Sequence, residues 1–322
     1  MIRILGPKGI PKPWKLGGDN YVLLRYEAGV PVLLVAFLWG CIEATGQAED
    51  DLNVYMMQAT VKIEGINSQG QKALGTAFIL LRPLPKQEGL PGTVTGKAVL
   101  ITAAHVLEEM QGDQAIIHLR MRQPQSTESW IRKRCLLAIR RNGQPLWKKK
   151  PDIDVAAMYI RLSVPIFDKA PTIDLLATDE MLQKYEITPG VELKCLGYPL
   201  GDESNTAGFP ILRTGNIASY PLLPTAQTKT FLFDFRVFKG NSGGPVYFSQ
   251  PQFRGSVTFG GRAQFVMGLV IDEHLLSELY GQYQLSLGVV VHASLVRQTI
   301  DLLPAPETPE ASSMAVQLIP IQ

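Results

Sequence analysis

The stretch Gly240-Asn241-Ser242-Gly243-Gly244-Pro245-Val246 decides the fold of this chain. Its serine stands among glycines, which lack a Cβ atom and can adopt the backbone angles of a tight turn. Such a turn can expose the serine hydroxyl and leave backbone N–H groups beside it. A glycine-rich hairpin turn would have the same composition, so this interpretation needs support from elsewhere in the chain.

Two upstream segments supply that support. Thr102-Ala103-Ala104-His105 places a histidine after small residues, and Asp152-Ile153-Asp154-Val155-Ala156 places aspartates before an apolar run. A histidine can take the proton of a serine hydroxyl, and an aspartate can hold the histidine ring. The order His, Asp, Ser along the chain is that of the chymotrypsin class and differs from the subtilisin and α/β-hydrolase orders.

The sequence resembles the trypsin-like serine proteases, most closely their bacterial HtrA/Deg-like branch. The resemblance extends over roughly residues 54–302. The segments that carry it, besides the serine stretch, are Gly75–Leu80, Ala98–Val106, Asp154–Met158, Leu196–Gly201, Thr214–Ser219 and Gly268–Ile271. Unlike most members of that branch, we expect this chain to have no PDZ domain.

The chemistry of peptide hydrolysis assigns a role to each of the three residues. A serine hydroxyl becomes a strong nucleophile when an adjacent base takes its proton. We therefore expect Ser242 to be the nucleophile, His105 the general base and Asp154 the carboxylate that holds the ring. Asp152 is the alternative to Asp154, which we favour because the apolar run Val155–Met158 follows it directly.

The shape of the turn also indicates where a negatively charged intermediate would be stabilised. The backbone N–H groups of Gly240 and Ser242 are the expected oxyanion donors. Asn241 stands where trypsins carry an aspartate that pairs with a newly cut N-terminus. The resemblance therefore implies a protease that needs no such activation.

The sequence says less about substrate recognition. The resemblance implies that a polypeptide substrate binds as an extended strand along Ile271-Asp272-Glu273. Arg236 stands six residues before Ser242, where trypsins place an aspartate at the floor of the pocket. Arginine there predicts a preference for acidic residues, whereas the HtrA-like branch favours small aliphatic ones. His292 is a further candidate for the pocket wall, with a core or surface position as the alternative.

From residue 54 the chain alternates short aliphatic or β-branched runs with Gly, Pro and Asn turns. The expected strands lie near 54–63, 74–82, 97–102, 114–121, 129–139 and 154–161, then near 191–197, 210–220, 229–236, 244–249, 264–272 and 285–292. Six strands followed by six predict an all-β fold of two consecutive six-stranded antiparallel barrels with a C-terminal helix.

These patterns divide the chain into three parts. We expect an export leader over 1–50, a protease domain over 51–303 and a flexible tail over 304–322. Within the domain, barrel one is expected at about 54–162, barrel two at about 190–292 and the helix at about 293–302. The tail is expected to lack regular structure because Pro304, Pro306 and Pro309 interrupt it.

The leader contains an apolar run over 28–42 behind a positively charged flank. Its length suits a signal peptide better than a transmembrane helix. Leu38–Cys41 resembles a lipobox with Cys41 as the lipid-bearing residue, which would anchor the protein to a membrane. Cleavage after Gly46 or Ala48 and an uncleaved anchor are the alternatives. We expect a protein exported by a bacterium, whether periplasmic, envelope-anchored or secreted.

Composition restricts the remaining function classes. The chain has 322 residues, of which 19% are charged, and its net charge of +2 gives no argument for a nucleic-acid partner. The basic runs at 132–134, 140–141 and 148–150 suit a solvated face, with an anionic membrane or acidic partner as the alternative. The sequence does not predict an oligomeric state.

The sequence predicts neither a metal nor another cofactor, because no metal-ligand spacing occurs and the four histidines are scattered. Cys135 and Cys195 are expected to be buried free thiols, with a disulfide between them as the alternative. The leading hypothesis is an exported serine endopeptidase. A catalytically weak protease-fold binding or scaffold module is the main alternative, and an esterase-like acyl hydrolase is a third.

Overall fold

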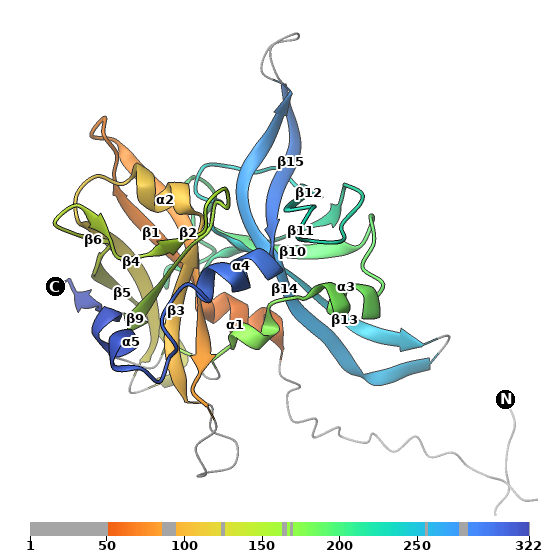
Figure 1. The fold of residues 1–322 in the computed structure, drawn as a ribbon, viewed down its shortest axis with the longest axis horizontal. Coiled ribbons are helices and arrows are strands. Elements are labelled where there is room, and N and C mark those ends of the chain that lie inside the picture. The colour runs from red at the N-terminus through yellow and green to blue at the C-terminus, as the bar shows by residue number, and fades with distance from the viewer. Residues whose placement is uncertain are drawn as a thin grey trace, which may run out of the picture. The chain divides into compact units, whose positions relative to one another are not determined.

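Apolar and β-branched runs separated by turns build two β-sheets, which lie side by side in the computed structural model (Figure 1). The structure describes residues 51–85, 95–123, 126–162, 166–167, 170–254, 257–276 and 283–321. The expected leader over 1–50, with Cys41, therefore lies outside the described residues. Within the described ranges, we find no helix with the length and apolar character that crossing a membrane requires.

The first sheet contains six main strands that pair in antiparallel fashion. They are β1 (Thr60–Ile66), β2 (Lys72–Pro83), β3 (Gly96–Thr102), β4 (Gln114–Gln123), β5 (Ser126–Ala138) and β9 (Ala156–Arg161). Their order across the sheet is β9, β3, β2, β1, β4, β5, and the short β8 (Lys148–Lys149) also pairs with β9. Both faces of β1 are buried. Val61 and Ile63 on one face pack into the core with Phe78, and Lys62 and Glu64 on the other face are buried as well.

The second sheet is a closed antiparallel barrel of six strands. In spatial order they are β10 (Glu192–Gly197), β11 (Ile211–Ile217), β12 (Thr230–Asp234), β15 (Tyr283–His292), β14 (Val257–Leu276) and β13 (Pro245–Arg254). The predicted fold class is therefore confirmed: the chain is an all-β protein with two consecutive antiparallel sheets and C-terminal helices.

Short helices and minor strands join these sheets. They are α1 (Leu52–Ala59), α2 (Ala104–Glu109), α3 (Asp179–Lys184), α4 (Ala293–Ile300), the 3₁₀ turns Ile173–Leu175 and Pro199–Gly201, and the paired β6 (Arg140–Arg141) and β7 (Gln144–Pro145). Because Asp51 caps α1 by accepting a hydrogen bond from the N–H of Asn53, the strand expected near 54–63 begins only at Thr60.

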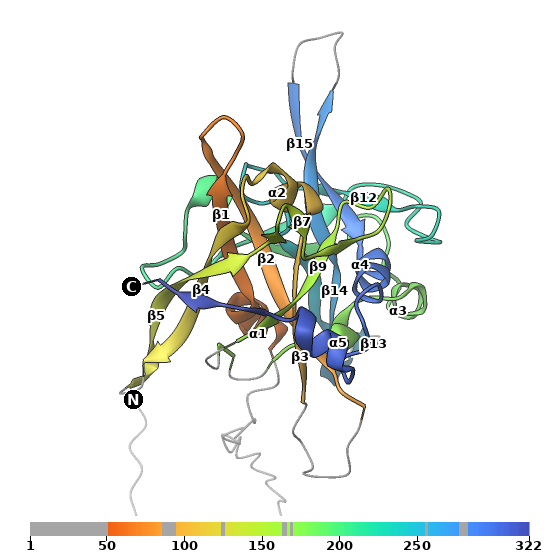
Figure 2. The same cartoon turned by 60° about the vertical axis from the view of Figure 1, so that its left-hand side comes forward.

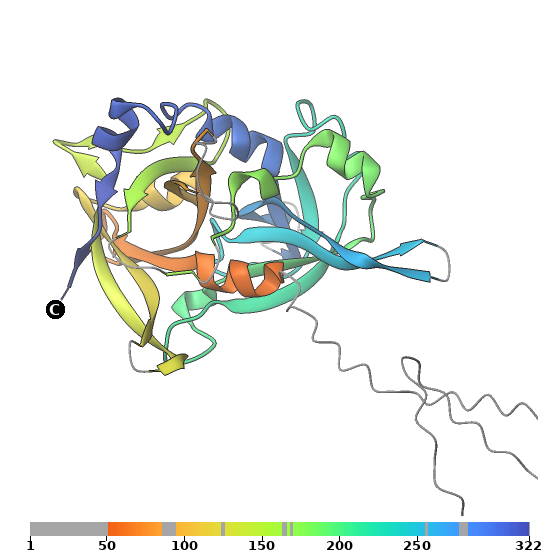
Figure 3. The same ribbon diagram turned by 90° about the horizontal axis from the view of Figure 1, so that it is seen from below.

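The C-terminal segment differs most from the sequence-based expectation. Instead of a tail without regular structure, it forms α5 (Pro309–Met314), β16 (Val316–Gln317) and β17 (Ile319–Pro320) along the first sheet (Figure 3). Pro309 occupies the first turn of α5, where its missing N–H costs nothing, so it begins a helix. Leu318 is buried between the two short strands.

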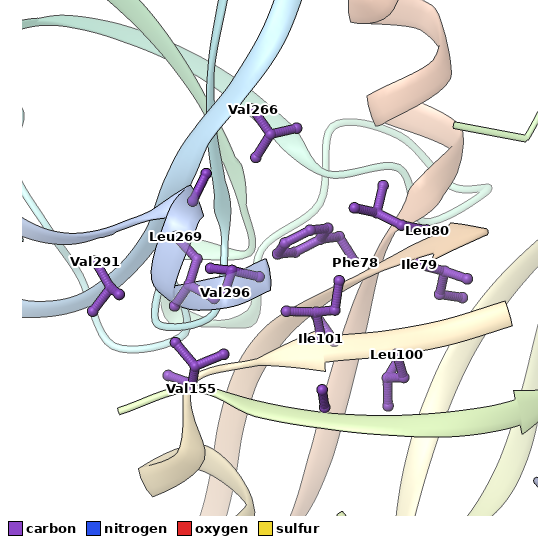
Figure 4. Packing of buried hydrophobic residues seen from close by; sticks show 14 of the residues in the cluster. Phe78, Ile79, Leu80, Leu100, Ile101, Val155, Val266, Leu269, Val291 and Val296 are labelled. Atoms are coloured by element: carbon purple, nitrogen blue, oxygen red, sulfur yellow. The ribbon is translucent and has the colours of Figure 1, made fainter. Parts of the chain in front are cut away.

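Side chains from both sheets form one continuous core. Figure 4 shows Phe78, Ile101 and Val155 of the first sheet region facing Leu269 of β14 and Val296 of α4. All five side chains are at most 1% exposed. Because Val155 follows Asp154 directly, this core fixes the backbone beside that carboxylate.

Candidate active site

The His105 ring and the Asp154 carboxylate form a hydrogen-bonded pair in the first sheet region. Nδ1 of His105 lies 2.6 Å from Oδ2 of Asp154, and the backbone N–H of His105 donates to Oδ1 at 2.9 Å. The pairing of β3 with β9 creates this contact, because Thr102 lies opposite Ala156 in the ladder. Both side chains are partly exposed, so the pair reaches the surface of the protein.

Asp152, the alternative carboxylate, lies in an exposed turn with a φ of 59°. Aspartate tolerates this left-handed conformation better than most residues. Among the described residues, Asp154 is the carboxylate hydrogen-bonded to the His105 ring. The arrangement therefore favours Asp154 over Asp152 as the partner of the histidine.

The serine stretch forms a tight turn that requires glycine on both sides of Ser242. Gly240 has a φ of 98° and Gly243 a φ of 85°, both in the left-handed region. A Cβ atom on Gly240 would lie 2.2 Å from the carbonyl oxygen of Tyr198. On Gly243 it would lie 2.0 Å from the carbonyl oxygen of Thr76. The close approach of neighbouring backbone therefore excludes any side chain at these two positions.

The serine turn packs directly on the segment that carries the histidine. The N–H of Thr76 donates to the carbonyl oxygen of Ser242 at 2.9 Å. A Cβ atom on Gly243 would lie only 3.0 Å from the backbone nitrogen of Ala103, two residues before His105. The fold thus brings the three predicted residues to one region, although no hydrogen bond joins Ser242 to His105 in the described structure. Catalytic hydrogen bonds of this kind often tighten only when substrate binds.

Two backbone amides at the serine turn remain available as donors. Within the described residues, no backbone carbonyl accepts a hydrogen bond from the N–H of Gly240 or of Ser242. The carbonyl of Gly240 is instead turned toward Thr76, whose hydroxyl donates to it at 2.6 Å. Amide donors beside a serine hydroxyl are the groups that stabilise a developing oxyanion.

The family model described as Trypsin matches residues 89–269, which is more than half of the 322-residue chain. The chain belongs to the trypsin family. No curated protein matches it. Membership of this family supports a general serine protease function with polypeptide substrates.

Solved protease structures are similar to this trypsin-family chain over most of its length. The apo MamO protease domain from Magnetospirillum magneticum is 16% identical, with a TM-score of 0.42 over 77% of this chain and 98% of its own. The HtrA-type protease AlgW, solved with a tripeptide, is 18% identical, with a TM-score of 0.43 over 77% of this chain and 60% of its own. The protease Anisep from Arthrobacter nicotinovorans is 13% identical, with a TM-score of 0.43 over 78% of this chain and 96% of its own.

The electrostatics of the pair stabilise a positive charge on His105 and a negative charge on Asp154. Burial lowers the pKa of His105, but the hydrogen bond and charge of Asp154, with the charges of Glu109 and Asp272, outweigh it and raise the pKa above its ordinary value. For Asp154, burial raises the pKa, but the hydrogen bonds and charge of His105 outweigh it and lower the pKa. The site thus stabilises the imidazolium that proton transfer would create.

The candidate substrate residues occupy different surroundings. Ile271 and Asp272 follow Val270 in β14, and Glu273 lies opposite Gly288 of β15. Asp272 is exposed and Ile271 half-buried. Arg236 is exposed as well, and its guanidinium lies 5.0 Å from the ring centroid of Phe238.

His292 lies in the core of the second barrel. Its side chain is buried against Phe231, with ring centroids 5.0 Å apart. Burial lowers the pKa of His292 to about 4, and the charge of Asp179 only partly opposes this. The ring is therefore neutral near pH 7, and its position fits the core alternative for this residue.

Sequence reasoning missed the residue that joins the two halves of the site. Buried Thr76 accepts a hydrogen bond from the N–H of Tyr198 at 3.2 Å while its own hydroxyl donates to Gly240. Thr102 completes this connection by donating to the carbonyl of Thr76 at 2.7 Å. The signal in the sequence is a lone polar residue, beside a glycine, inside the apolar run 74–81.

Two other kinds of reactive group concern the described residues, metal-ligand clusters and cysteine thiols. Searched within those residues, no group of three His, Cys, Asp or Glu side chains converges as metal ligands would. Cys135 and Cys195 are both buried and unbonded. Burial raises the pKa of the Cys135 thiol, and that of Cys195 to about 12, so neither thiol ionises readily.

Proposed function

We propose that this chain is a serine endopeptidase in which Ser242, His105 and Asp154 act together. The observation that carries the proposal is their arrangement: a carboxylate-bound histidine lies beside a glycine-held serine turn with two available amides. Trypsin-family membership supports the same chemistry. The surrounding core holds both halves in place, as preorganised catalysis requires.

Each group has a defined part in the proposed reaction. The Nδ1 proton of His105 is donated to Asp154, which leaves Nε2 free to act as a base. Nε2 takes the proton of the Ser242 hydroxyl while the serine oxygen attacks the substrate carbonyl carbon. The resulting oxyanion accepts hydrogen bonds from the N–H groups of Gly240 and Ser242.

Collapse of this intermediate breaks the peptide C–N bond. His105 gives its proton to the leaving amine, and the substrate acyl group stays bonded to Ser242. Water then attacks the acyl-enzyme with His105 as base, which releases the acid and restores the serine. The raised pKa of His105 favours its acceptance of the serine proton.

The neutral residue before the nucleophile supports a protease that needs no N-terminal cleavage for activity. Asn241 is buried, and a carboxylate at this place would require a cationic partner to offset its desolvation. An amide carries no charge and requires none. An N-terminally extended form that is inactive until it is trimmed would contradict this part of the proposal.

We also propose that the protein is exported, since a basic flank and an apolar run over 28–42 precede the catalytic domain in the sequence. Mass spectrometry of protein recovered from bacterial envelope fractions tests this. An N-terminus at residue 47 or 49 indicates peptidase cleavage, a lipid on Cys41 indicates anchoring, and an intact leader on cytoplasmic protein contradicts export.

Hydrolysis by the purified full chain tests the enzymatic proposal. We expect casein cleavage that Ser242→Ala, His105→Ala and Asp154→Asn each abolish or nearly abolish. The exposed residues Ser68 and Asp152 provide matched controls, so Ser68→Ala and Asp152→Asn should leave the rate unchanged.

A catalytically weak binding module is the second candidate, and the missing hydrogen bond between Ser242 and His105 is the observation that favours it. In that case casein would remain intact, and the wild type and Ser242→Ala would bind unfolded polypeptide with equal affinity. Cleavage that Ser242→Ala removes would eliminate this candidate.

A further inference from the structure

The short helix α2, which carries His105, has an unfavourable sequence for a helix. It contains only six residues, and Ala103 at its N-terminal boundary offers no side-chain group that could cap it. Glu108 and Glu109 place two negative charges in its last turn, where the helix dipole disfavours them. A helix of this length is not stable in isolation. The position of His105 therefore depends on contacts between α2 and the rest of the protein.

The side chain of Arg140 supplies such contacts at the C-terminal end of α2. Its Nη2 donates to the carbonyl of Leu107 at 2.8 Å. Its Nη1 donates to the carbonyls of Met110 and Gly112 at 2.7 and 2.8 Å. One planar guanidinium thus joins the last turn of the helix to the chain that follows it. Its positive charge also suits the negative end of the helix dipole.

Arg140 is itself held in place by the hairpin of β6 and β7, which Figure 2 shows beside α2. Asn142 and Gly143 form the turn of this hairpin with φ of 53° and 74°, the left-handed angles of a tight two-residue turn. The guanidinium lies over the ring of Trp147, 5.1 Å from its centroid, and Trp147 is only 7% exposed. The packed indole therefore fixes the guanidinium that supports α2.

Resting on the proposed function, we infer that Arg140 is a positioning residue, which holds α2 so that His105 stays aligned with Asp154 and the serine turn. The connection is short, because Leu107 lies two residues after His105 in the same helix. His105 contacts Asp154 through both its ring and its backbone N–H, so a displacement of α2 would disturb both contacts. A misplacement of about 1 Å can lower a rate by about 10²-fold.

A second cation of the same segment also contacts α2, with less expected influence. Nζ of Lys149 lies 2.8 Å from Oε1 of Glu108, and both side chains are exposed. Exposed ion pairs contribute little, because water screens the charges and both side chains lose conformational freedom. The positioning role therefore belongs to Arg140, which binds backbone carbonyls, and Lys149 provides a comparison.

Steady-state kinetics of full-chain variants on an unstructured peptide test the inference. Arg140→Gln removes the charge and the forked donors, so we expect kcat to fall by about tenfold or more. KM should change by less than about twofold, because the groups that bind substrate are untouched. Neighbouring Arg141 is exposed, so Arg141→Gln is the matched control with the same change of charge and should keep the wild-type kcat. Lys149→Gln should lower kcat by less than about twofold.

The conservative variant Arg140→Lys keeps the positive charge but not the planar fork of donors. We expect its kcat to lie between those of the wild type and Arg140→Gln. Far-UV circular dichroism and denaturant titration establish that each variant is folded. If Arg140→Gln does not fold, the lysine variant carries the test in its place.

Titration of the His105 ring by NMR separates a positioning role from a purely structural one. Burial lowers the pKa of His105, but the hydrogen bond and charge of Asp154, with the charges of Glu109 and Asp272, raise it above its ordinary value. Glu109 belongs to α2 and moves with the ring, so a displaced helix mainly weakens the contact with Asp154. The pKa of His105 should therefore be lower in the Arg140→Gln variant and unchanged in the control.

The two measurements also separate this inference from the proposed function. If the wild type cleaves no peptide but the His105 pKa still falls in Arg140→Gln, the positioning role stands and the endopeptidase proposal fails. A folded Arg140 variant that keeps the wild-type kcat and His105 pKa would overturn the inference, even if it is less stable. A fall in kcat with an unchanged His105 pKa, or one that Arg141→Gln shares, would overturn it as well.

Discussion

The two sheets of this protein are completed in different ways, and each supplies half of the proposed site. The second barrel closes with its own six strands and presents Ser242 with its amide donors. The first sheet holds His105 and Asp154, but its outer strands β9 and β5 each pair with a short strand from the far C-terminus. The histidine half of the site thus depends on residues that are distant from it in sequence.

Specific contacts fix the C-terminal segment on the first sheet (Figures 2 and 3). Val316 pairs with Ile160 of β9, and Ile319 pairs with Leu136 of β5. The guanidinium of Arg82 donates to the carbonyls of Leu303 and Pro304 at 3.1 and 3.2 Å. The comparison contrasts a barrel that closes with its own strands and a sheet whose two edges are extended by a distant segment, and each supplies half of the proposed site.

We expect the largest effect from variants that test whether the two halves of the proposed site act as one unit. His105→Ala in the first sheet and Ser242→Ala in the second should each lower kcat by about 10⁴-fold or more. The double variant should be no slower than either single variant, because each removes the same proton transfer. Steady-state kinetics on an unstructured peptide measures this, and multiplicative losses would show that the halves act independently.

Removing the buried contact of the C-terminal segment should destabilise the first sheet selectively. Leu318 is 2% exposed, so Leu318→Ala should lower the free energy of unfolding by about 2–5 kcal/mol. Neighbouring Ile319 is 55% exposed, and Ile319→Ala is the matched control with an effect of about 0.5 kcal/mol or less. Hydrogen exchange should increase in β9 and β5 but not in β10 to β12, and equal increases in both sheets would contradict the account.

Acid should weaken the two sheets over different pH ranges. Hydrogen bonding and charge from His118 and Lys72 outweigh burial and lower the pKa of Glu64 in β1 to about 2. Its contribution to stability is present above its unfolded pKa, near 4.5, and is lost as pH falls toward 2. Buried His292 in the second barrel has a pKa of about 4. The free energy of unfolding therefore starts to decrease as pH falls below 6.5, where the unfolded chain binds a proton that the folded one does not.

Titration of each of these two groups should lower the free energy of unfolding by about 3 kcal/mol across its pH range. Denaturant titrations from pH 7 to pH 2.5 measure the effect. Glu64→Gln should reduce the loss of stability below pH 4.5, and His292→Phe should reduce the loss between pH 6.5 and pH 4. Variants that keep the wild-type pH profile would show that other groups determine the acid response.

The smallest predicted effect concerns the connection between the sheets. Thr76→Ala removes the hydroxyl that donates to Gly240, so the amide donors should lose their alignment and kcat should fall about tenfold. Thr76→Ser restores the hydroxyl and should recover most of the rate. A loss of stability without a change in kcat would restrict Thr76 to a purely structural role.

Local signals explain which parts of this molecule the sequence predicted. The glycines around Ser242 and the alternating apolar runs of the second barrel act through neighbouring residues, so their structure follows from short-range patterns. The C-terminal strands depend on pairing with Ile160 and Leu136, which lie more than 150 residues away in sequence, so short-range patterns do not reveal them. The role of Thr76 is equally hidden from short-range patterns, since it bonds to Tyr198 and Gly240, which lie in turns next to strands of the second barrel.

Covalent labelling with a fluorophosphonate, followed by peptide mass spectrometry, tests the central claim most directly. The account predicts one phosphonylated residue, Ser242, with a labelling rate that falls by about 10³-fold or more in His105→Ala. The matched control Ser68→Ala should label at the wild-type rate. Folded wild-type protein that leaves Ser242 unlabelled, or labelling that His105→Ala does not slow, would contradict the account.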